Sequence, residues 1–244
     1  MQSSYIIPML DGTEIFVRVQ GEGYPLVFLH GNSMDSHYFD GQVDYFSHHY
    51  QVILVDNRGH GQSNIVSGDI SFKNMTEDLN QVFDYLGISE ALVIGHSDGA
   101  NLALVFQQAY PQKVAGLVLN AGNWRYKGLK IWFRMFSKLL YSVIFLLASI
   151  FPRYRRRKAV TRLVLEDLPI TKNDLKAVSI PVLVVVGEYD VIRKPHSKKM
   201  ANLFPHGEFR SLRGLKHNLA YKHAQIFNLI LRKFIKEVIR EKES

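Results

Sequence analysis

The chain has 244 residues, of which 47% are hydrophobic, so it can bury one sizeable core, and we expect a single domain that carries an insertion. It contains no cysteine, which excludes disulfides, thiolate nucleophiles and cysteine-based metal sites and favours a reducing compartment. The net charge of +8 is concentrated in residues 123–178, where thirteen Lys and Arg stand against three acidic residues. Because no nucleic-acid motif accompanies these charges, we expect no nucleic-acid partner.

The first ten residues carry no secretory pattern. They lack a basic segment followed by a long apolar run, which a signal sequence needs. We therefore expect a cytoplasmic protein.

Short runs rich in aliphatic and β-branched residues recur along the chain and predict strands. They lie at 14–20, 26–30, 51–56, 91–95, 114–120, 181–187 and 207–213. Most show no alternation with polar residues, as expected of a parallel sheet that helices cover on both faces. The segments between them predict helices at 74–86, 100–109, 195–204 and 219–236. The pattern predicts an α/β fold with a mostly parallel central sheet of about eight strands flanked by helices.

The regular alternation breaks after Asn120, where some 55 residues precede the next predicted strand. We predict that residues 1–122 and 179–244 form the core and that residues 123–178 form an inserted helical cap. Within the cap, residues 131–151 are strongly apolar, but the uninterrupted apolar run, 139–151, is only 13 residues long. We expect this run to be too short to span a bilayer.

One face of the cap is basic and its surroundings are apolar. A helix from Lys127 onward would place five residues on one face, namely Lys127, Lys130, Arg134, Lys138 and Ser142. In one interpretation the apolar surface roofs the substrate site and packs on a second cap helix or a dimer partner. In the other, the helix lies at a membrane surface, where its cations and those of the run 153–158 meet anionic lipid. A homodimer and a peripheral membrane contact are thus the two expected alternatives.

The strand at 91–95 leads directly into Gly-His-Ser-Asp-Gly at 95–99, which a helical sequence follows. This is the strand–turn–helix context of a G-x-S-x-G nucleophile elbow, which would expose the hydroxyl of Ser97 on a tight turn. Glycines fit at both ends because a side chain there would strike the neighbouring backbone. Ser97 is therefore the predicted nucleophile.

A serine hydroxyl needs a base, and the base needs an acid that fixes its tautomer. Asp190 follows the strand at 181–187, on the edge of the sheet where ligand chemistry gathers, and is the predicted acid. His217 lies in a loop just before the last predicted helix and is the predicted base. The alternatives are His206 or His223 as the base and Glu188 as the acid. No metal-ligand spacing occurs, so we expect no metal and no cofactor.

The sequence resembles the α/β-hydrolase superfamily. Besides the elbow, Asp190 and His217, the resemblance rests on LHGNS at 29–33 and DNRGHGQS at 56–63. It implies that the backbone N–H groups of Asn32 and Asp98 form an oxyanion hole. We expect His30 and His60 to be structural, hydrogen-bonded in tight loops, rather than catalytic.

The acidic residue beside the nucleophile departs from the usual pattern of the superfamily. Asp98 stands where an apolar residue is common, and its charge would oppose a developing oxyanion unless it is paired. Its partner is either a structural group such as a backbone amide or a cationic group of the substrate. We expect Asp98 and Trp124 to contact the substrate.

The predicted function is that of a cofactor-independent serine hydrolase that cleaves a carboxylic ester or a related small acyl substrate. Carbon–carbon bond cleavage and hydrolysis of a lactone, thioester, aminoacyl ester or amide are alternatives on the same three residues. A small-molecule receptor without activity is an alternative of a different class, because fold and triad alone do not select the reaction.

Overall fold

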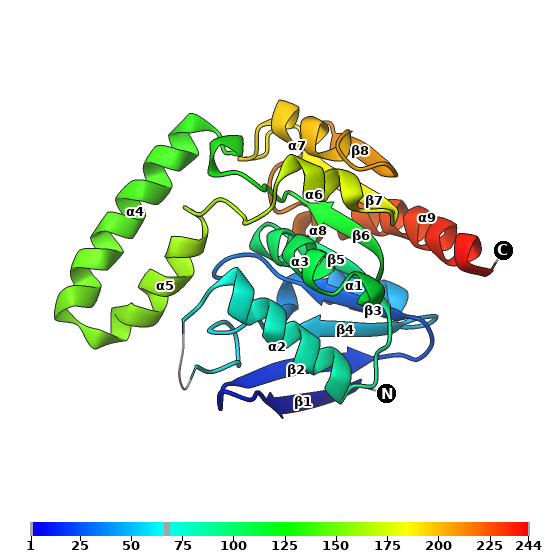
Figure 1. Cartoon of the computed structure of the whole chain (residues 1–244), viewed down its shortest axis with the longest axis horizontal. Helices are drawn as coiled ribbons and strands as arrows, with labels where there is room; N and C mark the ends of the chain where they lie inside the picture. Colours follow the sequence, from blue (N-terminus) through cyan, green and yellow to red (C-terminus); the bar gives the residue numbers. More distant parts are fainter. Residues whose placement is uncertain (1, 66–68, 244) are drawn as a thin grey trace.

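An eight-stranded sheet forms the centre of the computed structural model, which describes residues 2–65 and 69–243 (Figure 1). The strands are β1 Gln2–Pro8, β2 Glu14–Gln20, β3 Pro25–Leu29, β4 Gln51–Val55, β5 Ala91–His96, β6 Val114–Asn120, β7 Val182–Gly187 and β8 Gly207–Leu212. Their order is β1-β2-β4-β3-β5-β6-β7-β8, with β2 antiparallel to both of its neighbours and all other pairs parallel. The predicted α/β fold with a mostly parallel sheet is confirmed.

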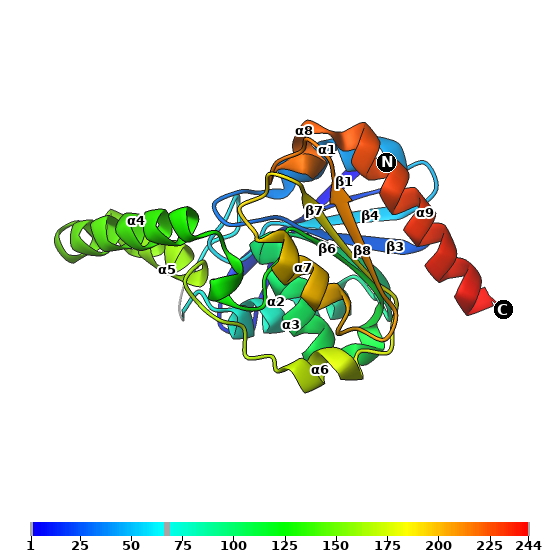
Figure 2. The same ribbon diagram turned by 90° about the horizontal axis from the view of Figure 1, so that it is seen from above.

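Helices cover both faces of this sheet (Figure 2). The α-helices are α1 Asp40–Phe46, α2 Phe72–Tyr85, α3 Asp98–Ala109, α4 Ile131–Ile150, α5 Arg155–Leu163, α6 Lys172–Ala177, α7 Lys194–Ala201, α8 Leu219–Lys222 and α9 Ala224–Glu243; short 3-10 turns are η1 Ser36–Phe39, η2 Pro111–Lys113, η3 Tyr126–Gly128 and η4 Pro152–Tyr154. One apolar core joins the sheet to α2, α3, α6 and α7, and a second joins it to α1, α8 and α9. Every residue of β5 and β7 is buried, which explains their unbroken apolar sequences.

Two elements at the ends of the chain differ from the prediction. Strand β1 was not predicted, because only one of its faces is covered: Ile7 is buried while its neighbour Ile6 is 63% exposed. The single helix predicted at 219–236 is two helices, α8 and α9, because His223 has non-helical dihedral angles (φ −132°, ψ 47°) and ends α8.

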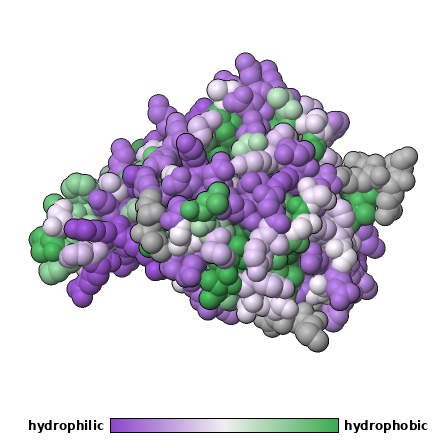
Figure 3. All heavy atoms as spheres, turned by 60° about the horizontal axis from the view of Figure 1, so that its bottom comes forward, coloured by the Kyte–Doolittle hydropathy of each residue, from purple (hydrophilic) through white to green (hydrophobic). Residues whose placement is uncertain are grey.

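Helices α4 and α5 form a hairpin that projects from the body as a lobe (Figures 1 and 2). Figure 3 shows hydrophobic residues gathered at the outer end of this lobe, beside hydrophilic ones. Helix α6 instead packs on the body, where Leu175 is fully buried in the core that contains α3. The hairpin is therefore the part of residues 123–178 that stands apart from the sheet.

The cap helix begins later than we predicted. Lys127 belongs to the short turn η3, and Leu129 pairs with Ile192 in an isolated antiparallel bridge. Since Lys130 has extended backbone angles and its N–H donates to the carbonyl of Val191, the helix starts only at Ile131. The predicted basic face is therefore wrong at Lys127 and Lys130.

The prediction about bilayer length also needs correction. The two cations near the start of α4 do not interrupt the helix, which has 20 residues and is long and apolar enough, by length and composition only, to cross a membrane. Just 17% of its most apolar stretch is buried in the fold. Most of the apolar surface of α4 is therefore not buried by the rest of the protein.

Candidate active site

Ser97 is the single residue between the end of β5 and the start of α3, and its backbone has a positive φ (φ 52°, ψ −118°). The turn is tight on both sides. A Cβ at Gly95 would strike the backbone of Gly99 and Ala100, and a Cβ at Gly99 would strike the carbonyl oxygens of Leu29 and His30. The Gly-x-Ser-x-Gly spacing therefore exists because only glycine fits at these two positions.

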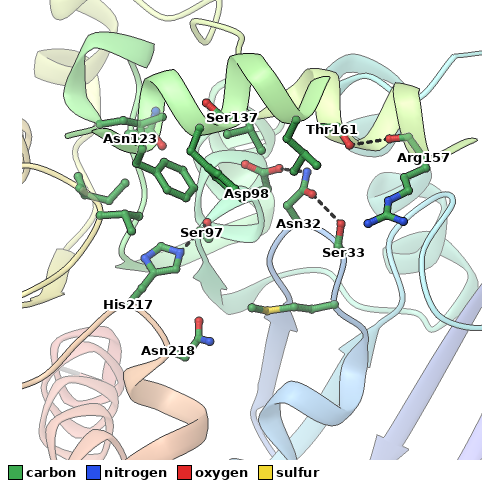
Figure 4. Close-up of a pocket in the computed structure, with 18 residues that line it drawn as sticks. Asn32, Ser33, Ser97, Asp98, Asn123, Ser137, Arg157, Thr161, His217 and Asn218 are labelled. Atoms are coloured by element: carbon green, nitrogen blue, oxygen red, sulfur yellow. Dashed lines mark hydrogen bonds between the residues drawn. The ribbon is translucent and has the colours of Figure 1, made fainter. Parts of the chain in front are cut away.

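Three loops at the carboxyl ends of parallel strands bring Ser97, His217 and Asp190 together. The Nε2 atom of His217 lies 3.1 Å from Oγ of Ser97, and its Nδ1 lies 2.8 Å from Oδ1 of Asp190. Figure 4 shows the imidazole ring of His217 directed at Ser97. The backbone N–H of Ile192 donates to the same Asp190 oxygen at 2.9 Å, so the carboxylate is held in place.

The Asp190 carboxyl group is ionised at neutral pH and can therefore orient a neutral histidine. Burial raises its pKa, but the hydrogen bonds from His217 and Ile192 outweigh burial and hold the pKa below its usual value. The ionised carboxylate then accepts from Nδ1–H of His217. In that tautomer Nε2 carries a lone pair that can accept the proton of Ser97.

A second histidine packs beneath the site and stays neutral. His96 is fully buried, and its ring stacks on Tyr38 with centroids 4.4 Å apart. Burial, together with the nearby His217, lowers the pKa of His96 to about 3. Its neutral ring can donate from Nδ1 to Oδ1 of Asn120 at 2.8 Å. His96 was not among the predicted site residues, although its place beside the nucleophile was a signal.

The partner of the Asp98 carboxylate is a pair of side-chain amides. Nδ2 of Asn32 donates to Oδ2 of Asp98 at 2.8 Å, and Nδ2 of Asn101 donates to Oδ1 at 3.5 Å. Burial raises the pKa of Asp98 to about 6, and the Asn32 bond limits that rise. Of the two alternatives left open by the sequence, the structure shows a structural partner, which is a pair of asparagine side chains.

In the described part of the chain no hydrogen bond joins Ser97 to any of the alternative acid and base candidates. Glu188 accepts from the backbone N–H of Gly214 at 2.8 Å. His223 ends α8, and His206 precedes β8. Among the described residues, Ser97 forms a side-chain hydrogen bond only with His217.

The two histidines that we expected to be structural make backbone hydrogen bonds. His30 accepts from the N–H of Asn57 at 3.0 Å, and Nδ1 of His60 lies 3.0 Å from the carbonyl oxygen of Arg58. Both rings are buried. Neither takes part in the hydrogen-bonded chain at Ser97.

Ser97 and His217 open onto a cavity of about 330 Å³ beneath the hairpin (Figure 4). Helix α4 contributes Phe133, Phe136, Ser137 and Leu140 to its lining, α5 contributes Arg157 and Thr161, and Val164 follows directly after α5. Further lining residues are Asn32, Ser33, Met34, Asp98, Asn123, Leu129, Val191, Ile192 and Asn218. Arg157, Thr161 and Val164 were missed, although their spacing of four and three is that of one helix face.

Trp124 is not among the residues that line this cavity. Its ring stacks on His196 with centroids 4.4 Å apart, and its side chain belongs to the apolar core. The prediction that Trp124 contacts the substrate is therefore not supported, and its neighbour Asn123 takes that place.

Within residues 2–65 and 69–243 no three His, Cys, Asp or Glu side chains gather in a way that could hold a metal ion. The described side chains of the site offer a hydroxyl, an imidazole and a carboxylate in one hydrogen-bonded chain beside the cavity.

The comparisons with known proteins place the chain among enzymes of varied chemistry. It is 31% identical over 106 residues to (E)-2-((N-methylformamido)methylene)succinate hydrolase of Acinetobacter baylyi, covering 43% of this chain and 40% of that protein. It is 37% identical over 113 residues to a non-heme chloroperoxidase of Streptomyces lividans, covering 45% and 41%. The matches thus span under half the length of these relatives.

A solved structure extends the similarity in fold to nearly the whole chain. A thermophilic esterase from Thermogutta terrifontis has a TM-score of 0.77 at 21% identity and covers 98% of this chain and 99% of its own. At that identity the match speaks for the fold alone. The family model described as alpha/beta hydrolase fold matches residues 24–166, which include the elbow at Ser97. The chain belongs to the alpha/beta hydrolase family.

Proposed function

We propose that the protein is a serine hydrolase that cleaves small carboxylic esters through an acyl-enzyme. The observation that carries the proposal is the continuous hydrogen-bonded chain from Ser97 through His217 to Asp190 at the edge of a cavity. Such a chain activates a hydroxyl that is otherwise a weak nucleophile at neutral pH.

In the proposed first half-reaction, Oγ of Ser97 attacks the ester carbonyl carbon while its proton passes to Nε2 of His217. The carboxylate of Asp190 stabilises the imidazolium. The tetrahedral intermediate then collapses, the alcohol leaves with the proton from Nε2, and the acyl group stays on Ser97. In the second half-reaction His217 takes a proton from water, which attacks the acyl group, and the acid leaves as Ser97 regains its proton.

We propose the backbone N–H groups of Asn32 and Asp98 as the oxyanion hole. Asp98 begins α3, so its N–H has no acceptor within the helix. The loop before Asn32 lies directly against the nucleophile, since a Cβ at Gly31 would be 3.1 Å from Cβ of Ser97. In the described part of the chain neither N–H donates a backbone hydrogen bond. Each such donor stabilises the transition state by about 3 kcal/mol.

The cavity favours a neutral substrate with a compact apolar acyl group. Its volume lies near the lower end of the range for small-molecule sites, roughly 300–1,000 Å³. Phe133, Phe136 and Leu140 form an apolar roof. Because Asn32 and Asn101 already engage the Asp98 carboxylate, we propose that Asp98 is structural rather than a receptor for a cationic substrate.

A fluorophosphonate probe followed by peptide mapping tests the nucleophile. The wild-type protein should be modified at Ser97, and Ser97→Ala should be neither modified nor active. His217→Ala should lower kcat/KM for a p-nitrophenyl ester by about a thousandfold or more, because triad residues act as a unit. His223→Ala is the matched control and should change it less than about twofold.

A folded protein that resists the probe completely would overturn the proposal and favour a receptor.

A substrate panel then tests the bond that is cleaved. Esters of graded acyl length should be turned over better than the matching amides, thioesters, lactones and β-diketones. Asp98→Asn should affect neutral and amino-acid esters equally, and a selective loss on amino-acid esters would return Asp98 to substrate recognition.

A further inference from the structure

The outward face of α4 is apolar along its whole length. Trp132, Met135, Leu139, Val143, Leu146 and Ile150 follow each other at three- and four-residue steps, and each is at least 46% exposed. The opposite face holds the buried residues Ser137, Ile144 and Ala148. An exposed apolar stripe along the whole of α4 indicates that this face of the helix contacts another apolar surface.

Cations without acidic partners accompany this stripe. Residues 123–165 contain eleven Lys and Arg and no Asp or Glu. Arg125 and Arg162 pair with acids outside this segment. In the described structure the other nine form no ion pair: Lys127, Lys130, Arg134, Lys138, Arg153, Arg155, Arg156, Arg157 and Lys158.

Several of these cations lie over exposed or half-buried aromatic rings of the hairpin. Arg153 lies 5.5 Å from the ring centroid of Phe151, and Lys158 lies 5.3 Å from that of Phe145. Apolar and cationic groups thus share one surface, and Figure 3 shows hydrophobic and hydrophilic residues adjoining on the lobe. This is the chemical pattern of a helix that enters the boundary between lipid headgroups and acyl chains.

The connections of the hairpin favour lying in that boundary over crossing the bilayer. Before α4, Leu129 is tied to Ile192. After it, α5 returns to the body, where Val160 and Leu163 are buried in the main core. Both ends of the hairpin are therefore held on the same side. If α4 crossed a bilayer, the arginines at 155–157 would have to enter its interior, which is costly.

We propose that the α4–α5 hairpin docks the protein on an anionic lipid surface, with the stripe of α4 in the acyl boundary and the unpaired cations on the headgroups. The other apolar surface that could cover the stripe is a second copy of this chain, and the charge of the unpaired cations favours lipid over that copy. Two copies would bring two sets of unpaired cations together, whereas anionic lipid neutralises them. This docking does not depend on the proposed reaction, because it uses none of the three residues Ser97, His217 and Asp190.

Co-sedimentation with vesicles tests the docking. The protein should sediment with vesicles of phosphatidylcholine and phosphatidylglycerol at 7:3, bind several-fold less as salt rises from 0.05 to 0.5 M, and bind weakly to phosphatidylcholine alone, because salt screens the cations. Trp124 is buried and Trp132 is 57% exposed, so a blue shift in tryptophan fluorescence on binding would report Trp132 entering lipid.

The double variant Leu139→Gln/Leu146→Gln should weaken vesicle binding at least about tenfold, since it removes two exposed apolar side chains from the stripe. The matched control is Leu229→Gln on α9, which is 56% exposed and should bind as the wild type does. Both variants should keep wild-type circular dichroism and wild-type turnover of a soluble ester. Arg153→Gln/Arg155→Gln should reduce the salt dependence, and Lys198→Gln/Lys199→Gln on α7 should not.

Protein that stays in the supernatant with anionic vesicles at low salt would overturn the proposal. So would a concentration-dependent dimer that the Leu139→Gln/Leu146→Gln variant abolishes, because the stripe would then face a second copy. Equal loss of binding in the α4 and α9 variants would likewise refute a specific role for the hairpin. Failure of the probe at Ser97 leaves each of these results unchanged, so the two proposals fail separately.

Discussion

Ser97 carries a Cβ at a backbone position that suits glycine, with φ at 52°. Strain of this kind costs on the order of 1–3 kcal/mol, and the surrounding structure has to hold it. The hydroxyl has to stand at this turn to reach Nε2 of His217. The cost in stability is thus a direct consequence of where the nucleophile is placed.

We expect Ser97→Gly to have a free energy of unfolding about 1 kcal/mol above that of Ser97→Ala, because alanine keeps the strained Cβ and glycine does not. Urea unfolding of the two inactive variants measures the difference. The same pair of changes at Ser142, in the middle of α4, should give the opposite sign, since glycine weakens a helix by about 1 kcal/mol. Equal stability of the two Ser97 variants would show that the turn stores no strain.

The Asp98 carboxyl group makes stability depend on pH in a defined direction. Its pKa is raised to about 6 by burial, against 3.8 for the exposed group. Below about pH 3 the carboxyl group is protonated in both the folded and the unfolded chain and contributes no difference. As pH rises to 7, the folded chain loses on the order of 3 kcal/mol relative to the unfolded chain.

Asp98→Asn removes this titration. The free energy of unfolding of the variant should therefore rise relative to that of the wild type between pH 4 and pH 7. Urea titrations of both proteins at several pH values measure it. Asp174→Asn, which changes a helix-capping residue, should give a difference that declines as pH rises through the acid range below about pH 5 and then stays flat, because the pKa of Asp174 is lowered. A flat difference for Asp98→Asn would mean that its pKa is not raised.

At this scale the sequence predicted Ser97, Asp190 and His217 from local context, because each lies where a strand, turn or helix boundary can be located. The geometry then brought all three within hydrogen-bonding distance. Trp124 could not be placed in the same way. Its position depends on a ring 72 residues later in the chain, His196, on which it stacks.

Helix α3 approaches strand β3 so closely that the contact has no room for a methyl group. Gly99→Ala should therefore lower the free energy of unfolding by at least about 3 kcal/mol or prevent folding, because its Cβ meets the backbone carbonyl groups of Leu29 and His30. Thermal unfolding or soluble yield measures the effect.

Gly87→Ala is the control for backbone strain alone. Gly87 also has positive φ, at 67°, but its added Cβ would meet nothing within 4 Å. Its cost should be about 1 kcal/mol. Similar losses at Gly87 and Gly99 would show that the close packing of α3 on β3 is not the cause.

Elements that are buried on both faces were the easiest to predict, since β5 and β7 form unbroken apolar runs between turns. Strand β1 was not predicted because its residues alternate between buried and exposed and form no unbroken apolar run. The start of α4 was placed too early because helical spacing alone does not reveal the bridge between Leu129 and Ile192. Such long-range pairs override local preference.

Across the whole molecule, stability is distributed unevenly between body and hairpin. Helix α4 buries only Ser137, Ile144 and Ala148 among its 20 residues, whereas the 12-residue α3 buries nine. Backbone amides of α4 should therefore exchange with deuterium at least tenfold faster than those of α3 in the protein without lipid. Hydrogen exchange with mass spectrometry measures both helices at once, and equal protection would contradict this distribution.

Helix α4 is a single rigid element with two different surroundings. Phe133, Phe136 and Leu140 line the cavity of Ser97, while Leu139 and Leu146 on the same helix face outward. A ligand that displaces α4 from inside must change the free energy of whatever holds it from outside. Thermodynamic reciprocity makes that coupling equal in both directions, so occupancy of the cavity and occupancy of the outer surface are linked equilibria rather than independent events.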